Sequence, residues 1–278
     1  MLPQQPSVVH VGGVTAVYWS DETTAITLAE IADRAGPWPG IPDPAPMRVR
    51  LILATSDAQF DSITAGRVPD WGAAAAFPAS RTIVLQVGRD HRRVLRHELA
   101  HIALHSVVRR VPRWFDEGYA AHAAGEWDQH DVLRVNWIVL RGVVPTMAGL
   151  DRHIREGGAA EAEASYALAA TAVRLLERLG GERGLEPLIT NMGDAPNLDE
   201  ALRSTYQITL GQFEVMWRRD LRKRYGWLLI FSSVTLFWAF VGLLLVVLWA
   251  RRRQRDRERR AALEDGWIVP EDQWNPNA

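Results

Sequence analysis

The sequence predicts an α+β fold followed by one transmembrane helix. Three observations support this prediction: strand-like runs separated by turns occupy the first 88 residues, helical periodicity dominates residues 89–222, and residues 227–250 contain no charged side chain. We therefore expect a mixed α/β part at 1–88, a helical part at 89–222, a membrane helix at 227–250, and a disordered tail at 251–278 that is first basic and then acidic.

Composition bounds the possible functions. The chain has 278 residues, of which 47% are hydrophobic, so it can form one sizeable domain plus an appendage. The net charge of −1 gives no indication of a nucleic-acid partner. The sequence contains no cysteine, which excludes a disulfide framework and cysteine ligands to a metal.

The first 88 residues are expected to form a small mixed sheet with one helix. Strands are predicted at residues 14–19, 47–54 and 81–87, with a short edge strand at residues 71–78. Asp21 is expected to cap a helix whose apolar face consists of Ala25, Leu28, Ala32 and Ala35.

The next predicted helix carries the sequence HELAH at residues 97–101. Its apolar residues recur at helical spacing, Asp90 is a suitable N-cap, and Pro112 is expected to end the segment. Residues four apart lie on the same side of a helix, so His97 and His101 can bind one metal ion, with Glu98 beside them. Two imidazoles at this spacing suit Zn²⁺, and the carboxylate can take a proton from water. The alternative is a set of exposed histidines in a His-rich segment.

A hydrolytic zinc site needs a third protein ligand. Metzincins supply a histidine six positions after the second one, with a glycine in between, but Val107 and Leu104 occupy those positions here. A glutamate on the following helix is the other option, and Glu117 lies sixteen positions after the second histidine. Two alternatives remain open, namely His105 as a ligand and Glu117 as part of a solvated acidic pair with Asp116.

The HELAH sequence followed by WFDEGYA at residues 114–120 resembles the gluzincin zinc metallopeptidases, and among them the membrane-anchored, peptidase-MA-like group with a W-x-x-E-G signature. The resemblance implies a zincin-like catalytic domain that holds Zn²⁺ through His97, His101 and Glu117. It also implies that Glu98 is the catalytic base and that peptides or proteins are the substrates.

Two further roles are implied by the resemblance. Gluzincins commonly offer a tyrosine from a later helix to the oxyanion on the scissile carbonyl, and Tyr166 would fill this role; the alternative is a buried structural tyrosine. The strand near the HELAH helix often pairs with extended substrate, which would be residues 71–87; the alternative is a plain hairpin. Many gluzincins also have an aspartate four residues after the liganding glutamate, where this chain has Ala121. We therefore expect Asp128 or a backbone carbonyl to orient a histidine ligand instead.

The helical part is expected to contain a helix at residues 164–179 that stops at Gly180, and a later helix that begins with a capping box of Thr209 and Gln212. A further helix is predicted with one apolar face, made of Leu133, Trp137 and Leu140.

The uncharged run at residues 227–250 is long enough to span the hydrocarbon core as a helix. Five cationic residues precede it between positions 218 and 224, and seven follow it between positions 251 and 260. This difference favours a single-pass protein with a cytoplasmic C-terminal tail and an extracytoplasmic catalytic domain. No signal peptide is visible after Met1, so we expect the natural start to lie upstream. A cytoplasmic enzyme on a tail anchor is the alternative.

The sequence therefore predicts a membrane-anchored zinc peptidase. Two alternatives remain: a catalytically silent, membrane-anchored binding or assembly module of the same fold, and a zinc hydrolase of a non-peptide bond. Glu98 argues against the first alternative, because a scaffold that only binds metal needs the histidines but not the base.

Overall fold

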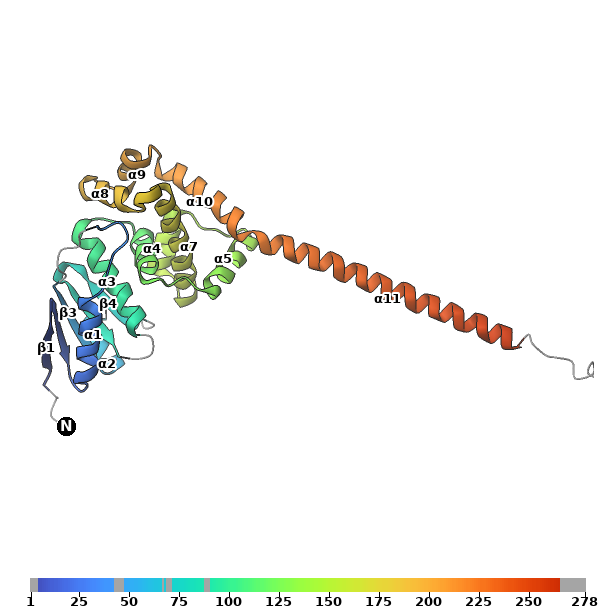
Figure 1. The fold of residues 1–278 in the computed structure, drawn as a ribbon, viewed down its shortest axis with the longest axis horizontal. Helices are drawn as coiled ribbons and strands as arrows, with labels where there is room; N and C mark the ends of the chain where they lie inside the picture. Colours follow the sequence, from blue (N-terminus) through green and yellow to red (C-terminus); the bar gives the residue numbers. More distant parts are fainter. Residues whose placement is uncertain (1–4, 43–47, 67, 69–71, 88–90, 266–278) are drawn as a thin grey trace, which may run out of the picture. The chain divides into compact units, whose positions relative to one another are not determined.

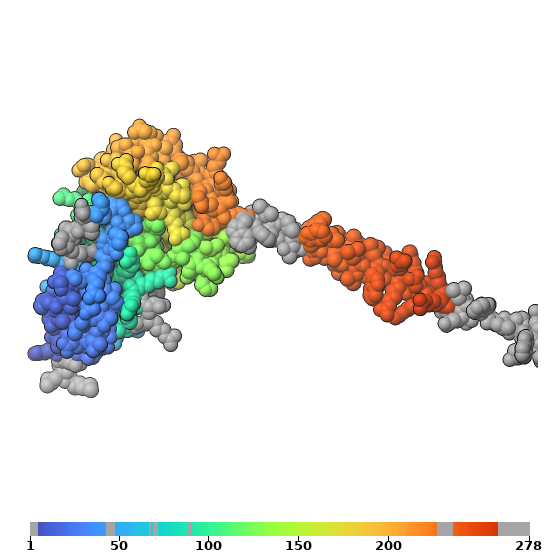
Figure 2. Space-filling view, in the orientation of Figure 1, coloured from blue at the N-terminus to red at the C-terminus, as the bar shows by residue number. Residues whose placement is uncertain are grey.

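The computed structural model describes residues 5–42, 48–66, 68, 72–87 and 91–265, without the side chains of residues 227–235 and 261–265. The chain divides into two units, residues 1–226 and residues 227–278. The first unit contains the sheet and the helical part, which lie against each other in Figures 1 and 2.

The described strands form one mixed sheet in the order β1-β2-β3-β5-β4. Their bounds are β1 (Ser7–Val11), β2 (Val14–Tyr18), β3 (Val49–Ala54), β4 (Ala74–Phe77) and β5 (Thr82–Gln86). The pairs β2–β3 and β3–β5 are parallel, whereas β1 and β4 pair antiparallel to their neighbours and lie at the two edges. The predicted strands are confirmed within the described residues; Met47 and Trp71, at the start of two predicted ranges, lie outside them. The mostly exposed β1 was not expected, because its side chains alternate too weakly.

Alternating side chains of the sheet contact different helices. Leu51 and Leu53 of β3 belong to the main core, which also includes buried residues of α1 (Glu22–Asp33) and α3 (His91–Val107). Ala54 lies in a smaller cluster, with Phe60 of α2 (Asp57–Thr64). This period of two is expected for a strand that is covered on both faces. Asp21 caps α1 as predicted, since its side chain accepts a hydrogen bond from the backbone N–H of Thr24 at 2.9 Å.

The helical part of the first unit is built around α7, which packs against α4, α5, α6 and α10. The helices are α4 (Arg113–Ala124), α5 (Gln129–Arg141), α6 (Met147–Glu156), α7 (Ala159–Leu179), α8 (Glu186–Asp194), α9 (Leu198–Tyr206) and α10 (Leu210–Tyr225). Figure 1 labels each of them except α6. The capping box of Thr209 and Gln212 is confirmed at the start of α10.

The prediction for the face of α5 is wrong. Leu133 and Trp137 are 53% and 56% exposed, whereas α5 buries Val135, Asn136 and Val139. Both sets have helical spacing, and spacing alone does not say which face meets α7.

The second unit contains α11 (Trp227–Asp265), a helix of 39 residues. The helix extends beyond the expected end of the membrane segment, so residues 251–265 are helical where disorder was predicted; residues 266–278 lie outside the described residues. Among the residues that the structure describes, no helix combines the length and the apolar character needed to cross a membrane. The side chains of residues 227–235, at the start of the expected membrane segment, lie outside the described part.

Candidate metal centre

Two consecutive helices, α3 and α4, carry the candidate ligands. On α3, Leu95 and Leu99 are fully buried in the main core and fix the orientation of the helix. The proposed cap at Asp90 lies outside the described residues. Pro112 is the N-cap of α4, and its extended backbone ends the link from α3.

The structure brings His97, His101 and Glu117 together. The Nε2 atoms of His97 and His101 lie 3.4 and 3.5 Å from the same oxygen of Glu117, Oε2. One ligand atom from each residue lies within 4.8 Å of the other two. Ligand atoms about 2.0–2.1 Å from a tetrahedral zinc ion are about 3.3 Å from one another, so the two nitrogen–oxygen distances fit such a site.

The second nitrogen of each imidazole has a carboxylate partner. His101 Nδ1 donates to Asp116 Oδ1 at 2.7 Å, and His97 Nδ1 donates to Glu126 Oε2 at 3.0 Å. Because a carboxylate can only accept, each Nδ1 carries a proton, so Nε2 is the nitrogen that would face a metal once it has lost its own proton. This donor set therefore fits a zinc ion.

Asp128 does not orient a histidine, so that expectation was wrong. Its side chain accepts hydrogen bonds from the backbone N–H groups of His130 and Asp131, at the start of α5. Glu126 takes this place instead, because of the turn that ends α4. Gly125 ends α4 with a φ of +70°, and the N–H of Glu126 then bonds back to the carbonyl of Ala121 at 3.0 Å. This reversal carries Glu126 to His97.

Asp116 and Glu117 are not a solvated acidic pair, since they are only 8% and 7% exposed. His105 is not one of the three clustered residues; its Nε2 lies 3.1 Å from Asp116 Oδ2. Asp116 therefore accepts from two histidines and is fixed by both.

When no metal is bound, the histidines and carboxylates of the cluster stabilise each other's charged forms. Burial alone would raise the pKa of Glu117, but His101 and His97 outweigh burial and lower it. Burial would likewise lower the pKa of His97, but the hydrogen bonds with Glu117 and Glu126 raise it to about 10. Metal binding must therefore release protons from the cluster, as is usual for sites of this kind.

Glu98 lies between this cluster and the sheet. Burial raises the pKa of its carboxyl group, while His101 and His97 act in the opposite direction. The carboxyl group also has a hydrogen bond with the backbone of Ala76, on edge strand β4. A carboxylate with a raised pKa beside a metal site is suited to accept and then return a proton.

Gly118, directly after Glu117, allows α4 and α7 to approach closely. A Cβ at this position would lie 2.6 Å from the carbonyl oxygen of Ala169 and 3.0 Å from Val173 Cγ2, both on α7. Only glycine fits such a contact. The close packing of α4 against α7 therefore requires the glycine of the W-x-x-E-G sequence.

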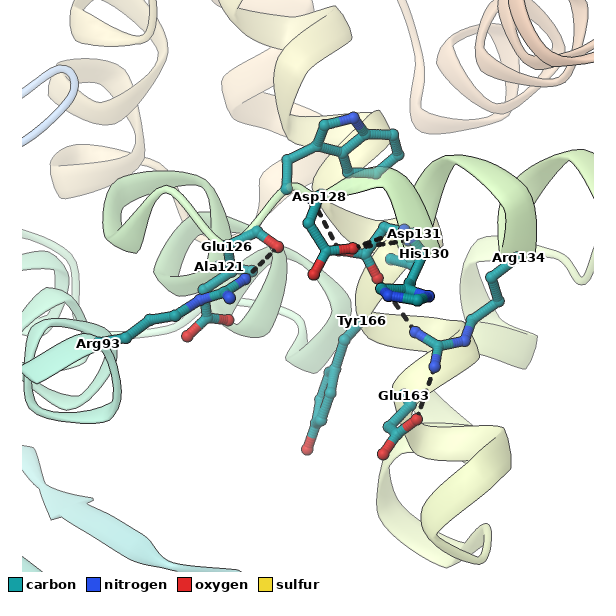
Figure 3. Close-up of a pocket in the computed structure, with 12 residues that line it drawn as sticks. Arg93, Ala121, Glu126, Asp128, His130, Asp131, Arg134, Glu163 and Tyr166 are labelled. Atoms are coloured by element: carbon teal, nitrogen blue, oxygen red, sulfur yellow. Dashed lines mark hydrogen bonds and ion pairs between the residues drawn. The ribbon is translucent and has the colours of Figure 1, made fainter. Parts of the chain in front are cut away.

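Tyr166, on α7, lines a pocket of about 280 Å³ together with Glu126 and Trp127. In Figure 3 its hydroxyl group points away from Asp128 and Asp131. Burial and, to a smaller extent, the nearby charge of Glu117 raise the pKa of this hydroxyl group. Arg113 acts in the opposite direction. The structure thus places Tyr166 near the cluster.

Two residues at the site were not predicted as partners of the histidines. The sequence contained a clue to Asp116, because this residue directly precedes the predicted ligand Glu117 on a helix that packs on α3. For Glu126 the only clue in the sequence was the preceding glycine. A glycine at the end of a helix indicates where the chain turns, but not where the next side chain points.

Comparisons with known proteins give one matching family and one similar solved structure. The sequence signature of the Peptidase MA superfamily matches residues 40–223. An M1 zinc metallopeptidase from Deinococcus radiodurans, solved with a Tyr-Ser-Ala substrate, is similar over 77% of this chain at 16% identity and a TM-score of 0.37. This chain spans about half, 51%, of that protein. No curated protein matches the sequence.

Proposed function

Because the chain belongs to the Peptidase MA superfamily, we propose that it is a membrane-anchored zinc metallopeptidase of gluzincin type. The observation that carries this proposal is the convergence of two Nε2 atoms on one oxygen of Glu117, with Glu98 beside them. The substrates are peptides or proteins.

In this proposal His97, His101 and Glu117 would hold a zinc ion, which supplies a Lewis acid that lowers the pKa of water and polarises a carbonyl group. Glu98 accepts the proton from the attacking water and passes it to the leaving amine. Tyr166 donates a hydrogen bond to the scissile carbonyl oxygen as charge develops there, and its raised pKa keeps the hydroxyl protonated.

Edge strand β4 supports the proposed choice of an extended peptide. It pairs with β5 on one side and is the last described strand of the sheet on the other. An edge strand offers backbone groups to a further strand. Since Ala76 of β4 contacts Glu98, a peptide on this edge would pass close to the base.

The membrane anchor rests on the uncharged run at residues 227–250, and the sidedness on the cationic residues around it. We place the C-terminal tail in the cytoplasm and the zinc unit outside.

Substitution of Glu98 tests the proposed reaction. In the purified full chain, Glu98→Gln should retain zinc but lose hydrolysis of a peptide library by about 10²–10⁴-fold, because an amide cannot accept the proton. Glu156→Gln, at the exposed end of α6, is the matched control and should behave as the wild type does. If the wild type binds zinc but cleaves no peptide, the binding module or the hydrolase of another bond takes the place of the peptidase.

A further inference from the structure

Glu126 is the start of a series of contacts that runs from His97 to the last residue of α10. Its carboxylate accepts from His97 Nδ1, as described above. Both polar groups of its backbone are hydrogen-bonded. The N–H donates to the carbonyl oxygen of Ala121, and the carbonyl oxygen accepts from Arg93 Nη2 at 2.6 Å. The contact with Arg93 is visible in Figure 3.

The next residue, Trp127, contacts two other helices. The guanidinium carbon of Arg174, on α7, lies 4.5 Å from the centroid of its ring. The ring of Tyr225 lies 5.8 Å away, centroid to centroid, at an angle of 57°. Cation–π and tilted aromatic contacts are favourable at these distances.

These contacts have a specific position in the chain. Tyr225 ends α10, and Gly226 is the last residue of the first unit. Residues about one hundred positions apart in the sequence therefore meet at the loop that orients His97.

We infer that Glu126 and Trp127 are positioning residues for His97. Glu126 fixes the proton and the direction of the imidazole, and Trp127, held by Arg174 and Tyr225, fixes Glu126. The affinity of the centre for metal thus depends on the end of α10. This inference rests on the proposed role of His97 as a zinc ligand.

A purely structural role for Trp127 makes a different prediction. Loss of its contacts would then lower the free energy of unfolding but leave the metal affinity of the folded protein unchanged. Positioning predicts weaker metal binding and a changed visible spectrum of the Co²⁺-substituted protein, because that spectrum reports the ligand geometry.

The test uses the full chain, with Zn²⁺ affinity measured by competition with a chelator and with Co²⁺ as the spectroscopic probe. Glu126→Ala should weaken Zn²⁺ binding about 10–100-fold. Glu126→Gln should weaken it less, because the amide oxygen still accepts the hydrogen bond but carries no charge. Trp127→Ala and Tyr225→Ala should also weaken binding, although less than Glu126→Ala does, and Trp127→Phe and Tyr225→Phe should restore most of it.

Two control variants separate these effects from general ones. Glu163→Gln removes a charge that lines the same pocket but pairs with Arg134. Trp137→Ala removes an exposed tryptophan with an arginine, Arg141, 5.8 Å from its ring. Both should keep the wild-type affinity and Co²⁺ spectrum.

The outcomes are distinguishable. Unchanged affinity and spectrum in Glu126→Ala would overturn the inference while leaving the zinc site in place. If Trp127→Ala does not fold, Tyr225→Ala decides, and wild-type affinity in that variant would overturn the coupling to α10. A wild type that binds no metal would overturn the proposed function and, with it, this inference.

Discussion

At the scale of single residues, two neighbouring carboxylates act on opposite sides of one imidazole. Asp116 contacts Nδ1 of His101 at 2.7 Å, and Glu117 faces Nε2 of the same ring at 3.5 Å. Successive residues of a helix point about 100° apart, so the two side chains reach the ring from different directions. His105 then holds the second oxygen of Asp116. The orientation of the ring is thus fixed before any metal binds.

The raised pKa of Glu98 predicts the pH dependence of the reaction. Burial moves this pKa above the ordinary value of a glutamate, 4.5. Only the ionised carboxylate can accept a proton, so activity is present above the pKa of Glu98 and is lost as the pH falls through it. The acidic limb of kcat/KM against pH should therefore follow the protonation of Glu98, whose pKa burial raises in the metal-free protein. A kcat/KM that does not fall at acidic pH, measured on a peptide with no titrating group, would contradict the proposed role of Glu98 as the base.

At the scale of the elements, the geometry of the candidate metal centre depends on how α4 packs between α3 and α7. Glu117 faces α3, and Gly118 lies against the backbone of α7 at Ala169. The position of α7 therefore determines how close α4, and with it Glu117, lies to the histidines.

Gly118→Ala should consequently destabilise the protein, although alanine is the better helix former. The added methyl group would clash with backbone that cannot rotate away, and overpacking of this kind costs about 1–3 kcal/mol. Chemical denaturation of the full chain measures the change. Gly158→Ala is the control, because a Cβ there meets nothing within 4 Å. A more stable Gly118→Ala variant would show that α4 and α7 can separate without cost.

The sequence was sufficient for elements with strong local signals. The helix with HELAH follows from its periodicity, and strand β5 from its run of β-branched and apolar residues. The face of α5 was not predictable, because Leu133 and Trp137 repeat as regularly as the residues that α5 buries. Glu126 was missed for another reason: its place beside His97 is set by the turn at Gly125, and a turn residue gives no direction for the side chain that follows.

At the scale of the whole molecule, the chain has one unit with the candidate metal centre and a second unit whose described residues, 227–265, form one long helix. Tyr225 closes the first unit beside the loop that carries Glu126. The second unit begins one residue after Gly226, and its first twenty-four residues are the uncharged run.

The proposed anchor predicts how the protein fractionates. The full chain should remain in the membrane pellet after alkaline carbonate extraction, because an apolar helix of this length is not displaced by loss of ionic contacts. A variant that stops after Gly226 should leave the pellet. Protease added to intact cells should digest the first unit and spare an epitope after Asn277. Release of the full chain by carbonate would exclude the anchor, and protection of the first unit would reverse its sidedness.

The zinc content of the purified full chain tests the central claim most directly. We expect about one zinc ion per wild-type chain, the same content in Glu98→Gln, and none in His101→Ala or Glu117→Ala, because two remaining ligands do not hold a structured tetrahedral site. Equal zinc content in the wild type and in both ligand variants would contradict the assignment of His97, His101 and Glu117 as the metal centre.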